Sequence, residues 1–214
     1  MKSITKQKSL EEIEQQLQNL GRVYIVGCGT CTAMTKTGGR EEVMNMKDRL
    51  QDLGKMVTGW IVIPTACDEM TEVSLRENNG AIQNANCILV MTCGLGVQRV
   101  ASYINKPVIP ALDTLFIGLE DSPGNFQEVC AQCGHCVLAW TAGICPITAC
   151  HKHLLNGPCG GTNNGKCEVD KNKDCAWTLI YQRLKEQGRL DLMRKYQPIK
   201  NSHVVPRPRM TTIS

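Results

Sequence analysis

The chain has 214 residues, 42% of them apolar, which is enough for one full-sized domain with a buried core and a smaller second region. The net charge is +4, acidic and basic residues are interspersed, and aromatic residues make up 4% of the chain, so we expect no nucleic-acid partner. No stretch has the length and hydropathy of a signal peptide or a membrane span. We therefore expect a cytoplasmic protein without membrane insertion.

The first half of the chain alternates short apolar runs with helical patterns. Ser9 and Glu12 have the spacing of a capping box at the start of a helix. The apolar runs, of which the last is the weakest, are 22–26, 60–63, 87–91 and 107–110. Strands that alternate with helices predict a parallel sheet with right-handed crossovers. The predicted fold class is α/β, with a doubly wound parallel-sheet (Rossmann-like) domain and its N-terminal helix over residues 1–120.

Four of the thirteen cysteines lie just after predicted strands: Cys28, Cys31, Cys67 and Cys93. The carboxyl ends of parallel strands gather at the edge where open α/β sheets bind their ligands. We therefore hypothesise a third metal centre there, with an iron–sulfur cluster favoured. The alternative is that these cysteines are small buried apolar residues, a common role for free cysteine. Cys87 begins an apolar strand and is expected to pack in the core.

The second region, predicted over 121–196, is a small, loop-dominated, cysteine-rich domain with a helix at its C-terminal end. In a cytoplasmic chain, clustered thiols favour metal binding over disulfides. Eight cysteines provide ligands for two [4Fe-4S] clusters: Cys130, Cys133, Cys136, Cys145, Cys150, Cys159, Cys167 and Cys175. We assign the first three, with one later cysteine, to one cluster, and four of the remaining five to the other. Gly134 is expected to let the C-x-x-C-x-x-C loop turn tightly.

Other groups near these cysteines have secondary roles in this interpretation. Asn156 and Gly157, in the glycine-rich segment NGPCGG, are candidates for hydrogen bonds to cluster sulfur. Two zinc ions in Cys₄ sites are the alternative to iron, because zinc uses the same thiolates. The triple C-x-x-C-x-x-C favours iron, since this spacing is more common around cubane clusters. The histidines of the region are not needed to complete either ligand set.

A resemblance to the methylenetetrahydrofolate reductase C-terminal domain family is carried by the segment CAQCGHCVLAWTAGICPITACHKHLLNGPCGGTNNGKCEVDKNKDCAWTLIY. Together with GCGTCTAMTKTGG, PTACDE and VMTCGLGVQ, it makes the whole chain similar to the small iron–sulfur subunit that accompanies the flavin-bearing reductase of acetogenic and related anaerobes. The resemblance implies a separate flavin-containing TIM-barrel partner that reduces 5,10-methylenetetrahydrofolate to 5-methyltetrahydrofolate. This chain would then relay electrons to that flavin from an electron-donor protein or subunit.

The same resemblance implies that the catalytic sites lie on the partner, so we expect no catalytic residue and no flavin in this chain. Thr32 also stands where the dinucleotide-binding fingerprint requires its third glycine. The alternative function is that of a zinc-binding structural or assembly subunit without a redox role. The last segment, 197–214, mixes proline with basic residues and is expected to be flexible or to wrap around the partner.

Overall fold

The computed structural model describes residues 2–200, which fall into two compact units. Unit 1 ends at Phe126, and unit 2 begins at Gln127. The fold is mixed α/β, with one parallel sheet and one antiparallel sheet. Within the described residues, no helix is both long and apolar enough to cross a membrane. Most of the predicted C-terminal tail, 201–214, lies outside this range.

The centre of unit 1 is a four-stranded parallel sheet with the order β3-β2-β4-β5. Its strands are β2 (Arg22–Cys28), β3 (Met56–Ile63), β4 (Cys87–Met91) and β5 (Val108–Pro110). The parallel strands expected from the alternating pattern are therefore confirmed. Because β2 runs parallel to both β3 and β4, the loops that follow these three strands leave the same edge of the sheet.

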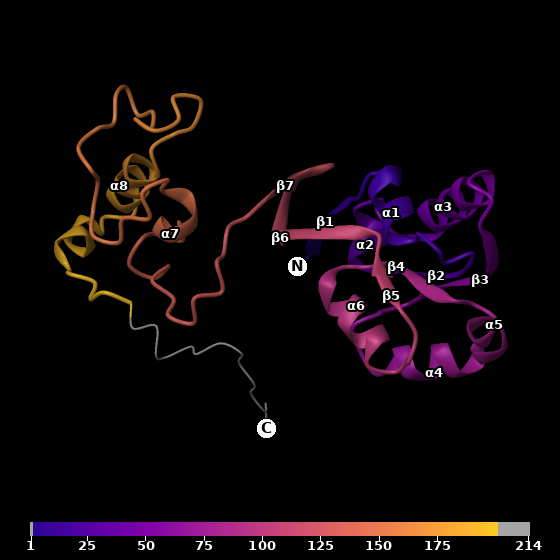
Figure 1. Ribbon diagram of the computed structural model, residues 1–214. Helices are drawn as coiled ribbons and strands as arrows, with labels where there is room; N and C mark the ends of the chain where they lie inside the picture. The colour runs from indigo at the N-terminus through magenta and orange to yellow at the C-terminus, as the bar shows by residue number, and fades with distance from the viewer. Residues whose placement is uncertain (1, 201–214) are drawn as a thin grey trace. The chain divides into compact units, whose positions relative to one another are not determined.

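Helices cover both faces of this sheet (Figure 1). On one face lie α1 (Leu10–Gln16) and α3 (Arg40–Asp52), and on the other lie α4 (Met70–Glu77), α5 (Asn79–Gln83) and α6 (Gly94–Ala101). A short helix, α2 (Cys31–Met34), follows β2. Side chains of β2 alternate between the two faces: Ile25 packs with α1 and α3, whereas Tyr24 packs with α4 to α6. Each face thus has its own apolar core.

A second sheet of unit 1 was not anticipated from the sequence. It is antiparallel and consists of β1 (Lys2–Gln7), β6 (Leu112–Ser122) and β7 (Asn125–Gln127), in the order β1-β6-β7. β1 pairs with β6 from Lys2 opposite Gly118 to Gln7 opposite Leu112. The capping box of α1 was expected, and the Ser9 side chain does accept a hydrogen bond from the Glu12 N–H (3.1 Å).

Unit 2 contains little regular structure: α7 (Pro146–Ala149), α8 (Ala176–Glu186) and the 3₁₀ helix η1 (Leu190–Arg194). α8 ends at Glu186, shortly before Gly188, whose φ is 67°. One face of α8 carries the core of the unit, in which Trp177, Ile180 and Leu184 are buried. The rest of its described residues, up to position 200, is loop and turn, so local secondary structure contributes little to the stability of this part.

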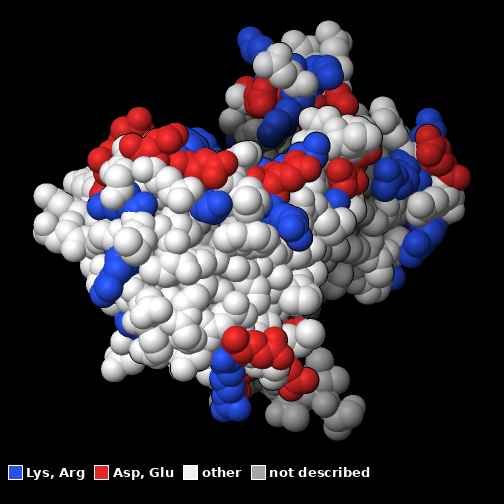
Figure 2. Space-filling view, turned by 90° about the vertical axis from the view of Figure 1, so that its right-hand side faces the viewer, with Lys and Arg blue, Asp and Glu red and all other residues white. Residues whose placement is uncertain are grey.

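Figure 2 shows a group of acidic side chains at the upper left of the view, with basic side chains close to it. A broad uncharged area lies below them.

Candidate metal centres

Four cysteines of unit 2 line one small pocket of about 20 Å³. They come from separate stretches of the chain, and they are Cys150, Cys159, Cys167 and Cys175. Trp177 of the α8 core and the aliphatic side chain of Val169 complete part of the wall. The fold therefore brings together four of the five later cysteines and leaves Cys145 outside this group.

Cys175 is the N-cap residue of α8. Burial raises the pKa of its thiol, but hydrogen bonds from the Thr178 side chain and from the backbone of Thr178 and Trp177 outweigh burial, so the pKa is lowered overall. A helix N-terminus favours negative charge because its first N–H groups lack intrahelical partners. The start of α8 is therefore suited to a thiolate, the form of cysteine that binds metals.

Cys159 receives a hydrogen bond from the backbone of the glycine-rich segment. The Gly161 N–H donates to its sulfur at 3.4 Å, and the Glu168 carboxylate lies 3.5 Å from the same atom. Lys152 pairs with Glu168 and so compensates its charge. An N–H donor stabilises a negatively charged sulfur, and Gly161 supplies one from this segment.

Cys167 has a histidine neighbour. The His151 Nδ1 lies 3.8 Å from the Cys167 sulfur, and its Nε2 lies 3.9 Å from the Asp170 carboxylate. His151 therefore lies next to the Cys167 thiol but is not one of the four residues proposed to bind metal through sulfur. The sequence gave no indication of this contact, because residues 151 and 167 are far apart in the chain.

The C-x-x-C-x-x-C loop turns through left-handed backbone conformations. Gln132 and Gly134 have φ values of 48° and 73°. The side chain of Lys200 donates to the Cys133 sulfur at 2.9 Å and also to the His135 carbonyl. The hydrogen bond from Lys200, followed by one with the His135 backbone, lowers the pKa of the Cys133 thiol. Cys130 and Cys136, on either side, are exposed.

Cys145 belongs to a helix that is tied to this loop. It is the N-cap of α7, and Pro146 occupies the first turn. The Thr148 hydroxyl donates to the Val129 carbonyl at 3.0 Å, next to Cys130 in sequence. This bond links α7 to the start of the C-x-x-C-x-x-C loop, so Cys145 is the later cysteine whose helix is bonded to that loop.

In unit 1, the four cysteines at the strand ends lie near one another. Burial, and then the neighbouring thiols of Cys93, Cys28 and Cys31, raise the pKa of Cys67. Cys28 and Cys93 are only 6% and 7% exposed, whereas Cys67 is exposed and Cys31 is partly exposed. The group of thiols thus extends from the sheet edge to the surface.

Two glycines permit the loops at this edge to approach closely. A Cβ on Gly38 would lie 1.9 Å from the Met91 carbonyl oxygen, and the Gly38 carbonyl accepts from the Cys28 N–H (3.0 Å). A Cβ on Gly96 would lie 2.5 Å from the Thr92 hydroxyl and 3.2 Å from Ala66. The loops that carry Cys31, Cys67 and Cys93 are therefore packed without room for a methyl group at either glycine.

Asn156, one of the two residues proposed to hydrogen-bond cluster sulfur, has a hydrogen-bond partner of its own. The Asn156 side chain donates to the Gln197 carbonyl and accepts from the Gln197 N–H, both at 2.7 Å. Gly157 has a φ of 108°, a conformation that favours glycine. The Asn156 amide thus joins two segments of unit 2.

Cys87, the thirteenth cysteine, belongs neither to the four at the strand ends nor to the eight in unit 2. Cys87 is fully buried in the core on the α1–α3 face, and burial raises its pKa to about 11. The expectation that it packs as an apolar residue is confirmed.

The donor sets fit a soft metal or an iron–sulfur cluster, since each consists of thiols and the unit 2 pocket gathers four of them. Within residues 2–200, no three Cys, His, Asp or Glu side chains form a ready-made metal site. Binding would therefore require the thiols to rotate toward a common centre.

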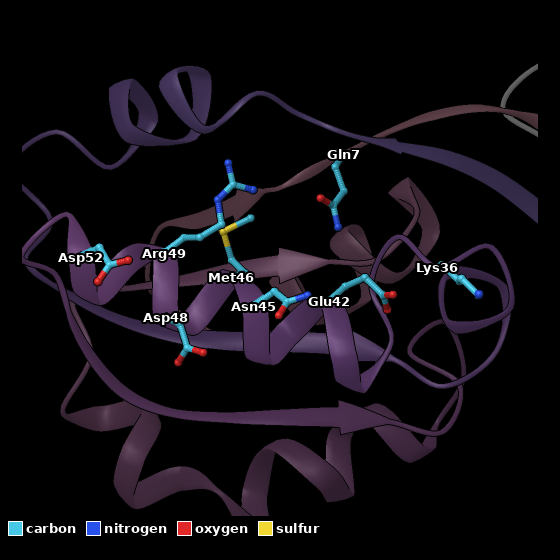
Figure 3. A pocket seen from close by; sticks show the side chains of 8 residues that line it. All are labelled: Gln7, Lys36, Glu42, Asn45, Met46, Asp48, Arg49 and Asp52. Atoms are coloured by element: carbon cyan, nitrogen blue, oxygen red, sulfur yellow. The ribbon is translucent and has the colours of Figure 1, made fainter.

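A larger pocket of about 580 Å³ lies beside α3. Gln7 reaches into it from β1, and Arg49 and Met46 reach into it from α3 (Figure 3). Its lining contains carboxylates, amides and basic groups but no cysteine. It is therefore separate from the candidate metal centres.

Residues 109–203 match one family model. Its description is methylene-tetrahydrofolate reductase C terminal. The match confirms the resemblance over this segment, which includes all eight cysteines of unit 2 and none of the four at the strand ends. Comparisons with curated proteins and with solved structures found no match.

Proposed function

We propose that the chain is a cytoplasmic iron–sulfur electron-transfer subunit of a flavin-dependent methylenetetrahydrofolate reductase complex. It would relay electrons from a donor protein to a flavin-containing TIM-barrel subunit that reduces 5,10-methylenetetrahydrofolate to 5-methyltetrahydrofolate. The observation that carries this proposal is the pocket lined by four cysteines, which lies within the segment that matches the reductase family. The parallel sheet of unit 1 would form a doubly wound, Rossmann-like domain.

The neighbours of each cysteine support a division into two ligand sets. Cys150, Cys159, Cys167 and Cys175 line the pocket and would hold one [4Fe-4S] cluster. Cys130, Cys133 and Cys136 would hold the other, with Cys145 as the fourth ligand, because its helix is hydrogen-bonded to the start of their loop. Each set supplies the four thiolates that a cubane cluster requires.

A third cluster would be held by Cys28, Cys31, Cys67 and Cys93. The effect of three of these thiols on the pKa of the fourth supports a common site. The partial exposure of Cys31 and Cys67 would bring this cluster near the surface, where a donor protein could approach it.

Bound [4Fe-4S] clusters supply one-electron transfer with little change in geometry. The residues of the chain then have three tasks, none of which is acid–base catalysis. The thiolates bind iron, the N–H of Gly161 and the first turn of α8 stabilise negative sulfur, and the α8 core keeps water from one side of the pocket.

The test is the content of iron, acid-labile sulfide and zinc in the full chain purified without oxygen. We expect about eight irons per chain for two clusters and about twelve with the third. Cys159→Ser should remove about four irons. Cys67→Ser should also remove about four irons if the third cluster is present, and none if it is absent. Cys87→Ser is the matched control and should retain all of the iron, because Cys87 lies in the core. Zinc without iron would contradict electron transfer and support a structural role.

A further inference from the structure

The segment 195–200, which we call the strap, follows η1 and contacts other parts of unit 2 at three places. The Lys195 ammonium lies 4.9 Å from the centre of the Trp140 ring. The Gln197 backbone forms two hydrogen bonds with the Asn156 side chain. Lys200 contacts Cys133 and the His135 carbonyl. Part of the segment predicted to be flexible or to wrap around a partner is therefore bound within its own unit.

The contact with Asn156 fixes the register of the strap. One amide side chain both donates to and accepts from the same residue, at 2.7 Å in each direction, so a shift of the strap by one residue would break both bonds. Lys200 follows Gln197 by three residues. Its position at the cysteine loop therefore depends on a contact formed elsewhere in the unit.

Lys200 reaches the middle cysteine of the C-x-x-C-x-x-C loop. Its ammonium lies 2.9 Å from the Cys133 sulfur, and both residues are partly buried. A second bond, to the His135 carbonyl, orients the ammonium along the backbone of the loop. A charged hydrogen bond to sulfur at a partly desolvated position is stronger than one in water. The contact therefore holds the Cys133 side chain in one orientation and places a positive charge beside it.

We propose that Lys200, held in register by the Asn156–Gln197 contact, is a positioning residue for the cluster of Cys130, Cys133, Cys136 and Cys145. The inference rests on the proposed function, since it requires a redox-active cluster at this loop. The reduced cluster carries one more negative charge than the oxidised cluster, so a fixed ammonium beside a ligand sulfur stabilises the reduced form. Lys200 thus makes this cluster easier to reduce than it would be without the lysine.

The test compares Lys200→Gln with the unmodified full chain by a redox titration followed by EPR. Loss of the charge should lower the ratio of reduced to oxidised cluster at a given potential about tenfold in one of the redox steps. This corresponds to a midpoint potential that is lower by ~59 mV. Lys200→Arg should restore most of the ratio, because arginine keeps the charge. Asn156→Ala should give a smaller shift in the same direction, because it releases the strap but keeps the lysine.

Lys185→Gln is the matched control, since Lys185 is an exposed lysine on α8 of the same unit and the substitution removes the same charge. Its redox steps should match those of the unmodified chain. If Lys200→Gln binds iron fully and titrates like Lys185→Gln, the role of Lys200 is overturned while the proposed function stands. A chain that contains no iron overturns both.

Discussion

Among the described residues 2–200, unit 1 buries apolar side chains on both faces of a parallel sheet, in two clusters of eleven residues each, whereas the buried cluster of unit 2 has four residues. Unit 2 nevertheless holds eight of the thirteen cysteines. A small region with so small a core needs covalent or metal cross-links to remain folded. The comparison indicates that metal binding in unit 1 would use a fold that exists without it, whereas in unit 2 it would be part of folding.

The largest expected effect is that of metal removal. Anaerobic chelation should abolish amide protection in α8 while leaving β2 and β4 protected, because only unit 2 depends on ligation for its stability. Hydrogen exchange followed by mass spectrometry measures both regions in one sample. Reconstitution with iron and sulfide is the control and should restore α8. Equal protection of α8 and β4 in the metal-free chain would contradict the dependence of unit 2 on metal.

An intermediate effect is expected from Gly96→Ala in unit 1. The added methyl group would lie 2.5 Å from the Thr92 hydroxyl and 3.2 Å from the Ala66 Cβ, so α6 must shift relative to the loops that carry Cys93 and Cys67. We expect a loss of about 1–3 kcal/mol in the free energy of unfolding and a lower iron content at the strand-end site. The measurements are denaturant unfolding and metal analysis.

The matched control for this substitution is Gly80→Ala in α5, where an added Cβ meets nothing within 4 Å. It should leave the iron content unchanged and keep or slightly raise stability, because alanine favours helix. A Gly96→Ala variant that behaves like Gly80→Ala would show that the close approach of α6 is unimportant for the site.

The smallest effect is a pH dependence that is absent at neutral pH. Burial raises the pKa of Cys87 from 9.0 to about 11, so its neutral thiol stabilises the folded state fully below pH 9. That contribution is lost as the pH rises from 9 through 11. The difference in unfolding free energy between the unmodified chain and Cys87→Ala should therefore change only above pH 9. A difference that stays constant to pH 11 would contradict the burial of this thiol.

The sequence predicted those parts of the fold that local patterns determine. The strand 87–91 was predicted with the bounds that it has, and the cysteines after three strands were predicted to lie at one sheet edge, where the pKa of Cys67 reflects the neighbouring thiols. Hydrophobic periodicity and the end of an apolar run were sufficient for these inferences.

The features that were missed depend on contacts between distant segments. β1 has a polar sequence and becomes a strand only because β6, late in unit 1, supplies its partner. The contact of Lys200 with Cys133 joins residues 67 positions apart. The grouping of Cys150 with Cys159, Cys167 and Cys175 also depends on how loops without periodicity fold back on α8. Spacing alone gave the number of ligands but left their partition open.

The most direct test of the central claim is EPR spin quantification on the full chain, purified without oxygen and then reduced with dithionite. Each reduced [4Fe-4S] cluster contributes one unpaired spin, so the account predicts about two spins per chain from unit 2 and about three if the strand-end site is also filled. Replacing one cysteine of the pocket, in Cys159→Ser, should lower the number of spins per chain by about one. A chain that binds its full complement of metal yet gives no signal on reduction would contradict the electron-transfer role.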